Sequence, residues 1–202
     1  GNLGLRQVNY QLTSTGFENY PTLSNNAALY PQNVQDFATG GSSEGVTVEG
    51  TDYSTVLPTF NLTASLQDDL IARFAVSKGL YYPSLTDTRN IKVMQISKTD
   101  ITDPNDPTQV IGVTDVQLTG QAKNPFLEPE ESTNIDVTLE WYFNKTDSLT
   151  ASLFHKKLDN IIRERAFAAP VTNNGVTLPG SFSGPVNEGS GDIQGIELSY
   201  TQ

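Results

Sequence analysis

The stretch Ile135-Asp136-Val137-Thr138-Leu139-Glu140-Trp141-Tyr142-Phe143 alternates between apolar and polar residues. Its odd-numbered residues are apolar, and its even-numbered residues include the acids Asp136 and Glu140. Successive side chains of a β-strand point to opposite faces of the sheet, so this period of two predicts a strand with one apolar face and one charged face. Apolar residues outside and charged residues inside are typical of strands in a membrane β-barrel.

The same alternation organises much of the chain into strand-turn-strand units. Residues 57–82 and 135–162 form two such units, which bend at the short polar turns 67–69 and 144–148. The second strand of the second unit runs from 149 to about 163, and the other expected strands are residues 3–12 and the stretch that begins at Ile193. The pattern therefore predicts about six antiparallel strands in total.

Long polar segments separate these units. Residues 13–52, 84–133 and 168–192 show no sustained period, so we expect loops there, with one small strand at 91–96. A soluble β-sandwich also shows alternating strands. However, loops longer than about 12 to 15 residues are uncommon in compact soluble domains. Short turns at one end and long loops at the other favour an outer-membrane barrel with its turns in the periplasm.

Composition excludes several classes of protein. Lys and Arg total 12 against 23 Asp and Glu, a net charge of −11, and nucleic acid is not an expected partner because phosphate contacts need clustered basic residues. The chain has no cysteine and one histidine, His155, and no motif for a catalytic triad or a His- or Cys-based metal site. We therefore expect no enzyme, no catalytic residue, no metal and no cofactor. His155 shares the parity of Leu153, which places it on the outer face.

Several blocks of sequence, in order, resemble the barrel of TonB-dependent outer-membrane receptors. The blocks are VLPTFNL at 56–62, DDLIARFAVSK at 68–78, NPFLEPEESTN at 124–134, LEWYF at 139–143 and GDIQGIELSY at 191–200. They cover most of the expected strands and almost none of the expected loops. The branch of receptors that they most resemble includes many oligosaccharide importers.

The resemblance implies an all-β fold, a partial antiparallel transmembrane β-barrel sheet with long extracellular loops. Barrels of this family have about 22 strands, so residues 1–202 are expected to be a fragment of the barrel domain, without the plug domain and the C-terminal end of the barrel. The implied function is uptake of an oligosaccharide or a ferric siderophore across the outer membrane of a Gram-negative bacterium. The TonB complex would supply the energy through the missing plug, and outer-membrane lipid would surround the barrel. The alternative is a soluble, secreted β-rich module for binding or adhesion.

Three charged residues of the expected strands are candidates for contact with the plug. Arg73, Asp136 and Glu140 have the parity of the lumen face. They are expected to contact the plug through charge-assisted hydrogen bonds, or otherwise only to hydrate the lumen.

Aromatic and cationic residues near the expected extracellular rim are candidates for ligand capture. These are Tyr53, Tyr81 and Arg89, together with the loop residues Tyr20, Tyr30 and Phe37. Tyrosine rings suit sugar rings or flat chelates by stacking, although the same rings could simply pack the loops. At the other end, Trp141, Tyr142 and Phe143 beside the second turn are expected to form an aromatic girdle at the membrane interface.

Overall fold

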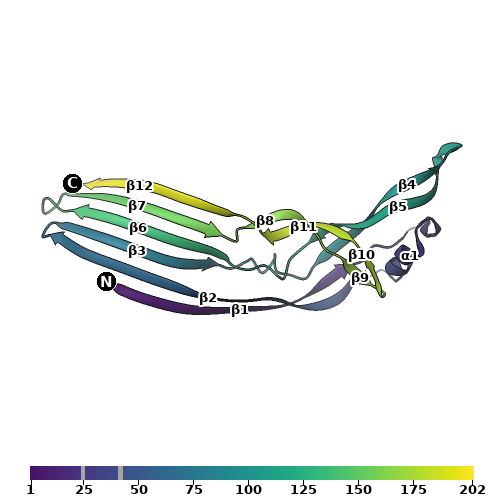
Figure 1. Ribbon diagram of the computed structural model, residues 1–202, viewed down its shortest axis with the longest axis horizontal. Helices are drawn as coiled ribbons and strands as arrows, with labels where there is room; N and C mark the ends of the chain where they lie inside the picture. The colour runs from purple at the N-terminus through teal and green to yellow at the C-terminus, as the bar shows by residue number, and fades with distance from the viewer. Residues whose placement is uncertain (24–25, 41–42) are drawn as a thin grey trace.

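The computed structural model describes residues 1–23, 26–40 and 43–202 and contains one long, curled sheet of ten strands (Figure 1). The strand order is β12-β7-β6-β3-β2-β1-β4-β5-β11-β8. The first six strands are antiparallel neighbours: β12 (Ser190–Thr201), β7 (Ser148–Asp159), β6 (Glu130–Trp141), β3 (Leu70–Tyr81), β2 (Ser43–Gln67) and β1 (Asn2–Asn19). The other four are β4 (Lys92–Asp103), β5 (Asp106–Ala122), β11 (Gly180–Asn187) and β8 (Ile162–Ala168). The expected all-β class, a partial antiparallel barrel sheet, is confirmed.

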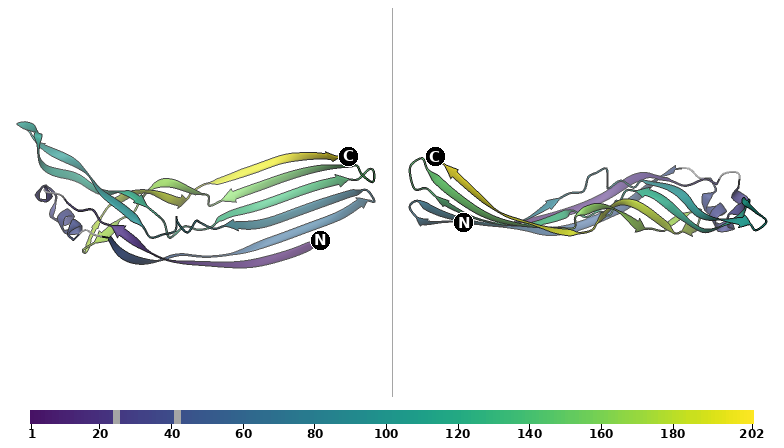
Figure 2. Two further views of the ribbon diagram at one scale, coloured as in Figure 1. Left: turned by 180° about the vertical axis from the view of Figure 1, so that it is seen from behind. Right: turned by 90° about the horizontal axis from the view of Figure 1, so that it is seen from above.

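The part of the sheet in which the six antiparallel strands lie side by side is called the wall. It consists of β3, β6, β7 and β12 with residues 2–6 of β1 and 57–67 of β2. The wall is curved along its length and twists toward the end that lies away from the turns (Figure 2). No helix among the described residues is long and apolar enough to span a membrane.

Both predicted turns are present and lie at the same end of the wall. Residues 68 and 69 connect β2 to β3, and residues 142–147 connect β6 to β7. The backbone N–H of Tyr142 donates a hydrogen bond to the carbonyl of Asp69 at 2.7 Å, which joins the two turns directly. The two ends of the chain lie at this same end of the molecule (Figure 1).

The segments predicted to be loops contain strands, so the expected count of six is too low. Within 13–52, β1 runs on to Asn19 and β2 already begins at Ser43, and the two strands stay paired there; residues 24–25 and 41–42 lie outside the described residues. Within 84–133, the small strand expected at 91–96 is the first part of the longer strand β4, which forms a hairpin with β5. Within 168–192 lie β11 and the short hairpin of β9 (Val171–Asn173) and β10 (Val176–Leu178).

These additional strands lack a period of two for physical reasons. In residues 13–19 one face is buried against residues 90–92, but it carries Ser14, Gly16 and Glu18, which are polar or small, so no apolar alternation results. In the β4–β5 hairpin, register shifts occur between Ser97 and Thr99 and again between Ile101 and Asp103. A shift of one residue moves the following side chains to the opposite face, which erases the alternation. The strand expected at 149–163 is interrupted at Asn160, whose φ of 58° ends β7 before β8 begins.

The end of the sheet opposite the turns carries a compact unit, called the loop module. It consists of β4, β5, β8, β11, the β9–β10 hairpin and the short helix α1 (Gln32–Ala38), which the 3-10 helix η1 (Ala27–Leu29) precedes (Figure 1). Its core contains Val34, Phe37, Met94, Leu118, Ala122, Val171, Leu178 and Phe182. Phe37, Leu118 and Phe182 have no exposed surface. The loop module is therefore stabilised by an ordinary buried core, whereas the wall leaves its apolar side chains exposed.

Candidate functional site

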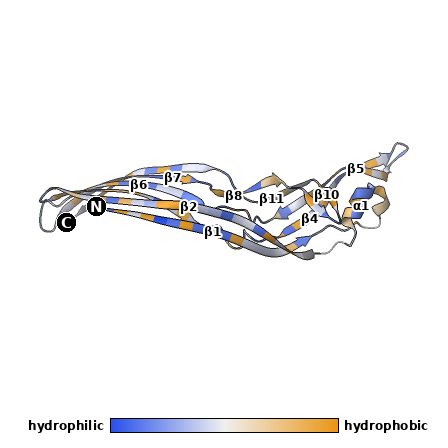
Figure 3. Cartoon of the chain, turned by 60° about the horizontal axis from the view of Figure 1, so that its bottom comes forward, coloured by the Kyte–Doolittle hydropathy of each residue, from blue (hydrophilic) through white to orange (hydrophobic). Residues whose placement is uncertain are grey.

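The wall has one apolar and one polar face, as the alternation predicts. Leu62, Phe74, Val137, Leu153 and Ile196 lie opposite one another in a single row across five strands. Each is a third or more exposed, between 36% for Phe74 and 72% for Ile196. Burying a large apolar side chain stabilises a protein by about 1.5–3 kcal/mol, so such a row left in water would oppose folding. We call this face the outer face and the opposite one the lumen face; Figure 3 shows the alternation as bands of colour along the strands.

Two different features bound the apolar row of the outer face. At the turn end, the rings of Trp141 and Phe143 lie 5.1 Å apart, and Phe143 stacks on Tyr200 with centroids 6.4 Å apart and an interplanar angle of 11°. Trp141 Nε1 also donates a hydrogen bond to Asp69 Oδ2 at 3.0 Å. This cluster forms at the position predicted for an interfacial girdle.

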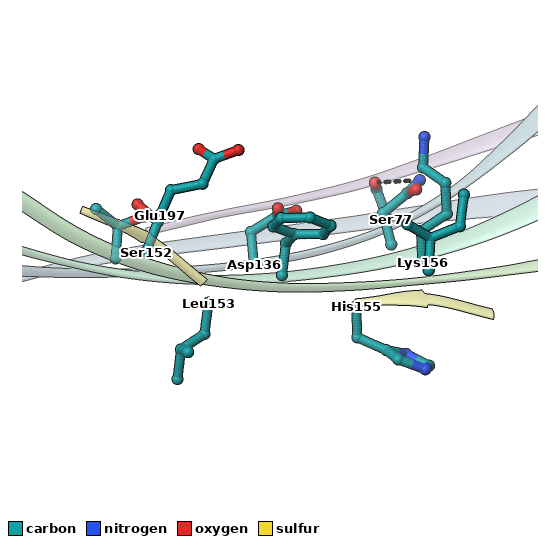
Figure 4. A pocket seen from close by; sticks show the side chains of 11 residues that line it. Ser77, Asp136, Ser152, Leu153, His155, Lys156 and Glu197 are labelled. Atoms are coloured by element: carbon teal, nitrogen blue, oxygen red, sulfur yellow. Dashed lines mark hydrogen bonds between the residues drawn. The ribbon is translucent and has the colours of Figure 1, made fainter. Parts of the chain in front are cut away.

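At the other end of the outer face, pairs of polar and charged side chains replace the apolar ones. Lys78 Nζ lies 2.7 Å from Glu131 Oε2, and His155 Nε2 lies 3.2 Å from Asp192 Oδ1. Figure 4 shows His155 on the same face as Leu153 and opposite Asp136, in agreement with its parity. Among the described residues, no group of three or more His, Cys, Asp or Glu side chains is placed to hold a metal ion.

The lumen face of β6, β7 and β12 carries a polar groove of about 610 Å³. Asp136, Ser152 and Glu197 project into it together from three adjacent strands (Figure 4). Ser77, Asn134, Thr138, Phe154, Lys156 and Ile193 also line it. A groove of hydroxyl, amide and charged groups is suited to hydrogen bonding with a polar ligand or with another polar segment of protein.

Arg73 and Glu140, two of the residues predicted on the lumen face, pair with each other. Arg73 Nε and Nη2 donate hydrogen bonds to the two carboxylate oxygens of Glu140 at 2.7 and 3.2 Å, and Arg73 Nη1 donates to Thr63 Oγ1 at 3.4 Å. This bidentate geometry fixes both side chains against the wall. Asp136, the third predicted residue, lies instead in the groove.

Tyrosines from three strands meet at the rim where the wall continues toward the loop module. Tyr10 lies directly opposite Tyr53 across β1 and β2, and the rings of Tyr10 and Tyr82 are 5.4 Å apart. The Tyr53 hydroxyl donates a hydrogen bond to Glu131 Oε1. Tyr81 is 70% exposed beside them. We call Tyr10, Tyr53, Tyr81 and Tyr82 the rim tyrosines.

Among the rim tyrosines, Tyr53 has the phenol whose pKa is raised furthest. It lies on β2 beyond the last pair of β2 with β3, at Thr59, and so outside the membrane-spanning wall. Burial, together with the hydrogen bond donated to Glu131, raises the pKa of its phenol to about 12. The hydroxyl therefore remains a protonated donor at any physiological pH.

Sequence reasoning found only part of this rim. Tyr53 and Tyr81 were predicted for ligand capture, but Tyr10 was missed because its partner lies some forty residues away along the chain. Tyr82 was not among the residues predicted for ligand capture. Arg89, the remaining candidate, is exposed in the segment between β3 and β4.

Three loop aromatics lie in or against the core of the loop module. Phe37 is completely buried in the core of the loop module, and Tyr20 and Tyr30 pack against that core. The rings of Tyr20 and Phe37 meet edge to face at 6.0 Å. The expectation that Phe37 presents aromatic surface to a ligand is therefore wrong, because the loops fold around these rings.

The sequence profile of the family described as "TonB dependent receptor-like, beta-barrel" matches residues 1–202. The chain belongs to the TonB-dependent receptor β-barrel family. Membership agrees with the outer apolar row, the aromatic girdle and the polar lumen face, and it decides against the soluble module considered from the sequence. The comparison with curated protein sequences gave no match.

The solved structures that are similar to this chain include two receptors. The siderophore receptor PirA from Acinetobacter baumannii has 18% identity and a TM-score of 0.48, over 73% of this chain and 20% of the receptor. A double mutant of the Serratia marcescens hemophore receptor HasR, in complex with its hemophore HasA and heme, has 17% identity and a TM-score of 0.49, over 98% of this chain and 28% of the receptor. The chain thus spans between a fifth and under a third of these receptors, and likeness at this level says nothing about its own ligand.

Proposed function

We propose that this chain forms part of the barrel of an outer-membrane importer that takes up a small-molecule ligand with energy supplied through TonB. The observation that carries the proposal is the position of the polar groove on the lumen face of a wall whose other face is apolar. The rim tyrosines lie at the end of the wall away from the turns. In this arrangement ligand is captured at the rim and passes along a hydrated wall, and the chain has no catalytic activity of its own.

The lumen face has a second role in the proposal, as the surface on which a plug domain docks. Asp136 and Glu197 project into the groove as carboxylates, which can accept charge-assisted hydrogen bonds from a plug. Arg73 and Glu140 already satisfy each other. Of the three residues first considered for plug contact, Asp136 is therefore the one best placed for it.

We infer that an oligosaccharide is the first candidate for the ligand and a ferric siderophore the second. Exposed tyrosine rings can stack on sugar rings, and the groove offers hydroxyl, amide and carboxylate partners for sugar hydroxyls. Ferric siderophores are often anionic and call for a basic site, whereas this chain carries a net charge of −11. The second candidate is kept because flat chelates also stack on tyrosine.

Growth and uptake of a strain that lacks the gene test this function. Maltoheptaose as sole carbon source and ferric enterobactin under iron limitation are suitable first probes for the two ligand classes. The proposal expects that one class of ligand supports growth only when the gene is present. A tonB deletion should abolish the same uptake, and restored gene expression should not rescue it in that background.

Radiolabelled ligand provides the direct readout, since growth depends on later metabolism as well. Uptake that is equal with and without the gene, for a panel of neutral oligosaccharides and a panel of ferric siderophores, would overturn the proposal. Uptake that needs the gene but not tonB would show that TonB does not supply the energy, and that part of the proposal would be wrong.

A further inference from the structure

The β9–β10 hairpin carries an Asn-Gly turn whose asparagine has two separate roles. Residues Asn174 and Gly175 connect the two strands, with φ values of 50° and 75°. Positive φ at both central residues defines a type I′ turn, for which Asn-Gly is a preferred sequence. The backbone of Asn174 therefore needs only a residue that tolerates the left-handed conformation, and its side chain is free to do something else.

That side chain reaches the C-terminal end of α1, which lies more than 130 residues earlier in the sequence. Asn174 Nδ2 donates hydrogen bonds to the carbonyls of Asp36 at 3.0 Å and Thr39 at 2.7 Å, with a longer one to Phe37 at 3.4 Å. The neighbouring Asn173 Nδ2 donates to the Phe37 carbonyl at 2.7 Å. Two side-chain amides from one hairpin thus converge on one helix end.

These contacts supply hydrogen-bond donors to carbonyls at the C-terminal end of α1. The last four carbonyls of an α-helix have no partner within the helix, and the Thr39 hydroxyl and backbone N–H satisfy only those of Gln35 and Asp36. The carbonyl of Phe37 is satisfied from the hairpin. Since α1 has only seven residues, far below the length at which an isolated helix is stable in water, its order depends on such external partners.

We propose that Asn173 and Asn174 form a latch that joins the helix α1 to the β9–β10 hairpin, so that the two move as one body. The latch works with the packing of Val34 and Phe37 into the core shared with Val171 and Leu178. The packing attracts α1 to the hairpin in any orientation that buries its apolar face, and the directional amide bonds select one orientation. Asn174 is thus a positioning residue for α1, whatever ligand the protein carries.

Two substitutions separate the latch from the turn. Asn174→Gly keeps a residue suited to the type I′ turn and removes the amide. Asn174→Asp keeps the shape, but it replaces the donor by a carboxylate that faces helix carbonyls and the negative end of the helix dipole. Asn33→Asp, at an exposed position near the start of α1, is the matched control for the added charge.

Spin labels report the relative motion of α1 and the hairpin in the whole protein purified from outer membranes. Residues 1–202 contain no cysteine, so Gln32→Cys on α1 and Thr172→Cys on β9, both exposed positions, introduce the only thiols of this part of the protein; any cysteine elsewhere in the protein is replaced by serine. We expect one narrow distance distribution in the parent protein and in Asn33→Asp, and a distribution about twice as wide in both Asn174 variants. Hydrogen exchange of residues 32–38 should also become about tenfold faster in the Asn174 variants while β4 and β5 are unchanged.

Distance distributions and exchange rates that are the same in Asn174→Gly, Asn174→Asp and the parent would overturn the latch as proposed, and would leave the apolar core and the single bond from Asn173 as the link. The readouts do not depend on transport. A protein that fails every uptake assay can still show the latch, and a protein without the latch can still be an importer.

Discussion

A β-carbon on Gly195 of β12 would lie 2.7 Å from two ring carbons of Phe154, its direct partner on β7. The ring covers the space that any side chain at position 195 would occupy on the lumen face. We predict that Gly195→Ala destabilises the protein by about 1–3 kcal/mol, because the extra methyl forces the ring from its position. Urea unfolding of the protein in lipid vesicles, followed by tryptophan fluorescence of Trp141, measures the change.

Gly191→Ala on the same strand is the matched control for this substitution. A β-carbon there would meet only Ile161 Cδ1, at 3.8 Å, an ordinary contact distance. We expect it to change stability by less than about 0.5 kcal/mol. Phe154→Leu should recover part of the loss in the Gly195→Ala background. Equal effects of Gly195→Ala and Gly191→Ala would show that the ring does not constrain the strand.

The aromatic girdle makes a second prediction. Tyr200 stacks on Phe143 from the far strand of the wall, so Tyr200→Ala should cost about 0.5–1.5 kcal/mol beyond the loss of buried area. Tyr200→Phe keeps the ring and should retain most of this stability. Unfolding free energies of the two variants in vesicles distinguish the ring contribution from that of the hydroxyl; a loss as large in Tyr200→Phe as in Tyr200→Ala contradicts the stacking argument.

The rim tyrosines make a third prediction, which concerns the ligand. Tyr82 is 43% exposed and contacts Tyr10 at the rim, whereas Tyr142 is 46% exposed at the turn end. Tyr82→Ala should raise the half-saturating ligand concentration for uptake about two- to tenfold, the equivalent of one lost stacking contact. Tyr82→Phe should behave like the parent, and so should Tyr142→Ala. If Tyr142→Ala impairs uptake as much as Tyr82→Ala, the rim is not the capture site.

The wall was predictable because a bilayer imposes its pattern on the sequence. Leu139 must face lipid while Glu140 faces the lumen, so strands with a wet and a dry face alternate strictly. Beyond the membrane this requirement ends, so the strands of the loop module do not alternate between apolar and polar residues, and the sequence did not predict them. Gly16 of β1 is an example of a residue whose role the sequence alone does not reveal. A β-carbon there would collide with the backbone carbonyl of Asn90, because the segment between β3 and β4 crosses β1.

The sequence predicted on which face of the sheet the candidate residues lie, but not which of them contact one another. Parity placed Arg73, Asp136 and Glu140 on one face, but only the register between β3 and β6 pairs the first with the third. The same holds for Tyr10, whose partner Tyr53 follows from the pairing of β1 with β2. Residues that meet across strands distant in sequence leave no local pattern.

The raised pKa of Tyr53 makes a fourth prediction, about alkaline pH. Its folded pKa of about 12 lies above the ordinary value near 10 for tyrosine. A group that holds its proton more tightly when folded contributes stability at pH values below its ordinary pKa, and this stability is lost as pH rises from about 10 through 12. Because Tyr53 is only partly buried, solvent screening makes the effect smaller than the pKa shift alone implies.

Difference spectra of phenolate absorbance between the parent and Tyr53→Phe isolate this one titration. We expect a midpoint close to pH 12 for the missing phenol, and a steeper loss of stability above pH 10 in the parent than in Tyr53→Phe. Glu131→Gln removes the charged acceptor of the Tyr53 hydroxyl, so the midpoint should move toward the ordinary value, while burial keeps it from returning fully. A midpoint near 10 in the parent itself would mean that the Tyr53 hydroxyl is open to water, and the rim would then offer the ligand a hydrogen-bond donor that the bond to Glu131 otherwise occupies.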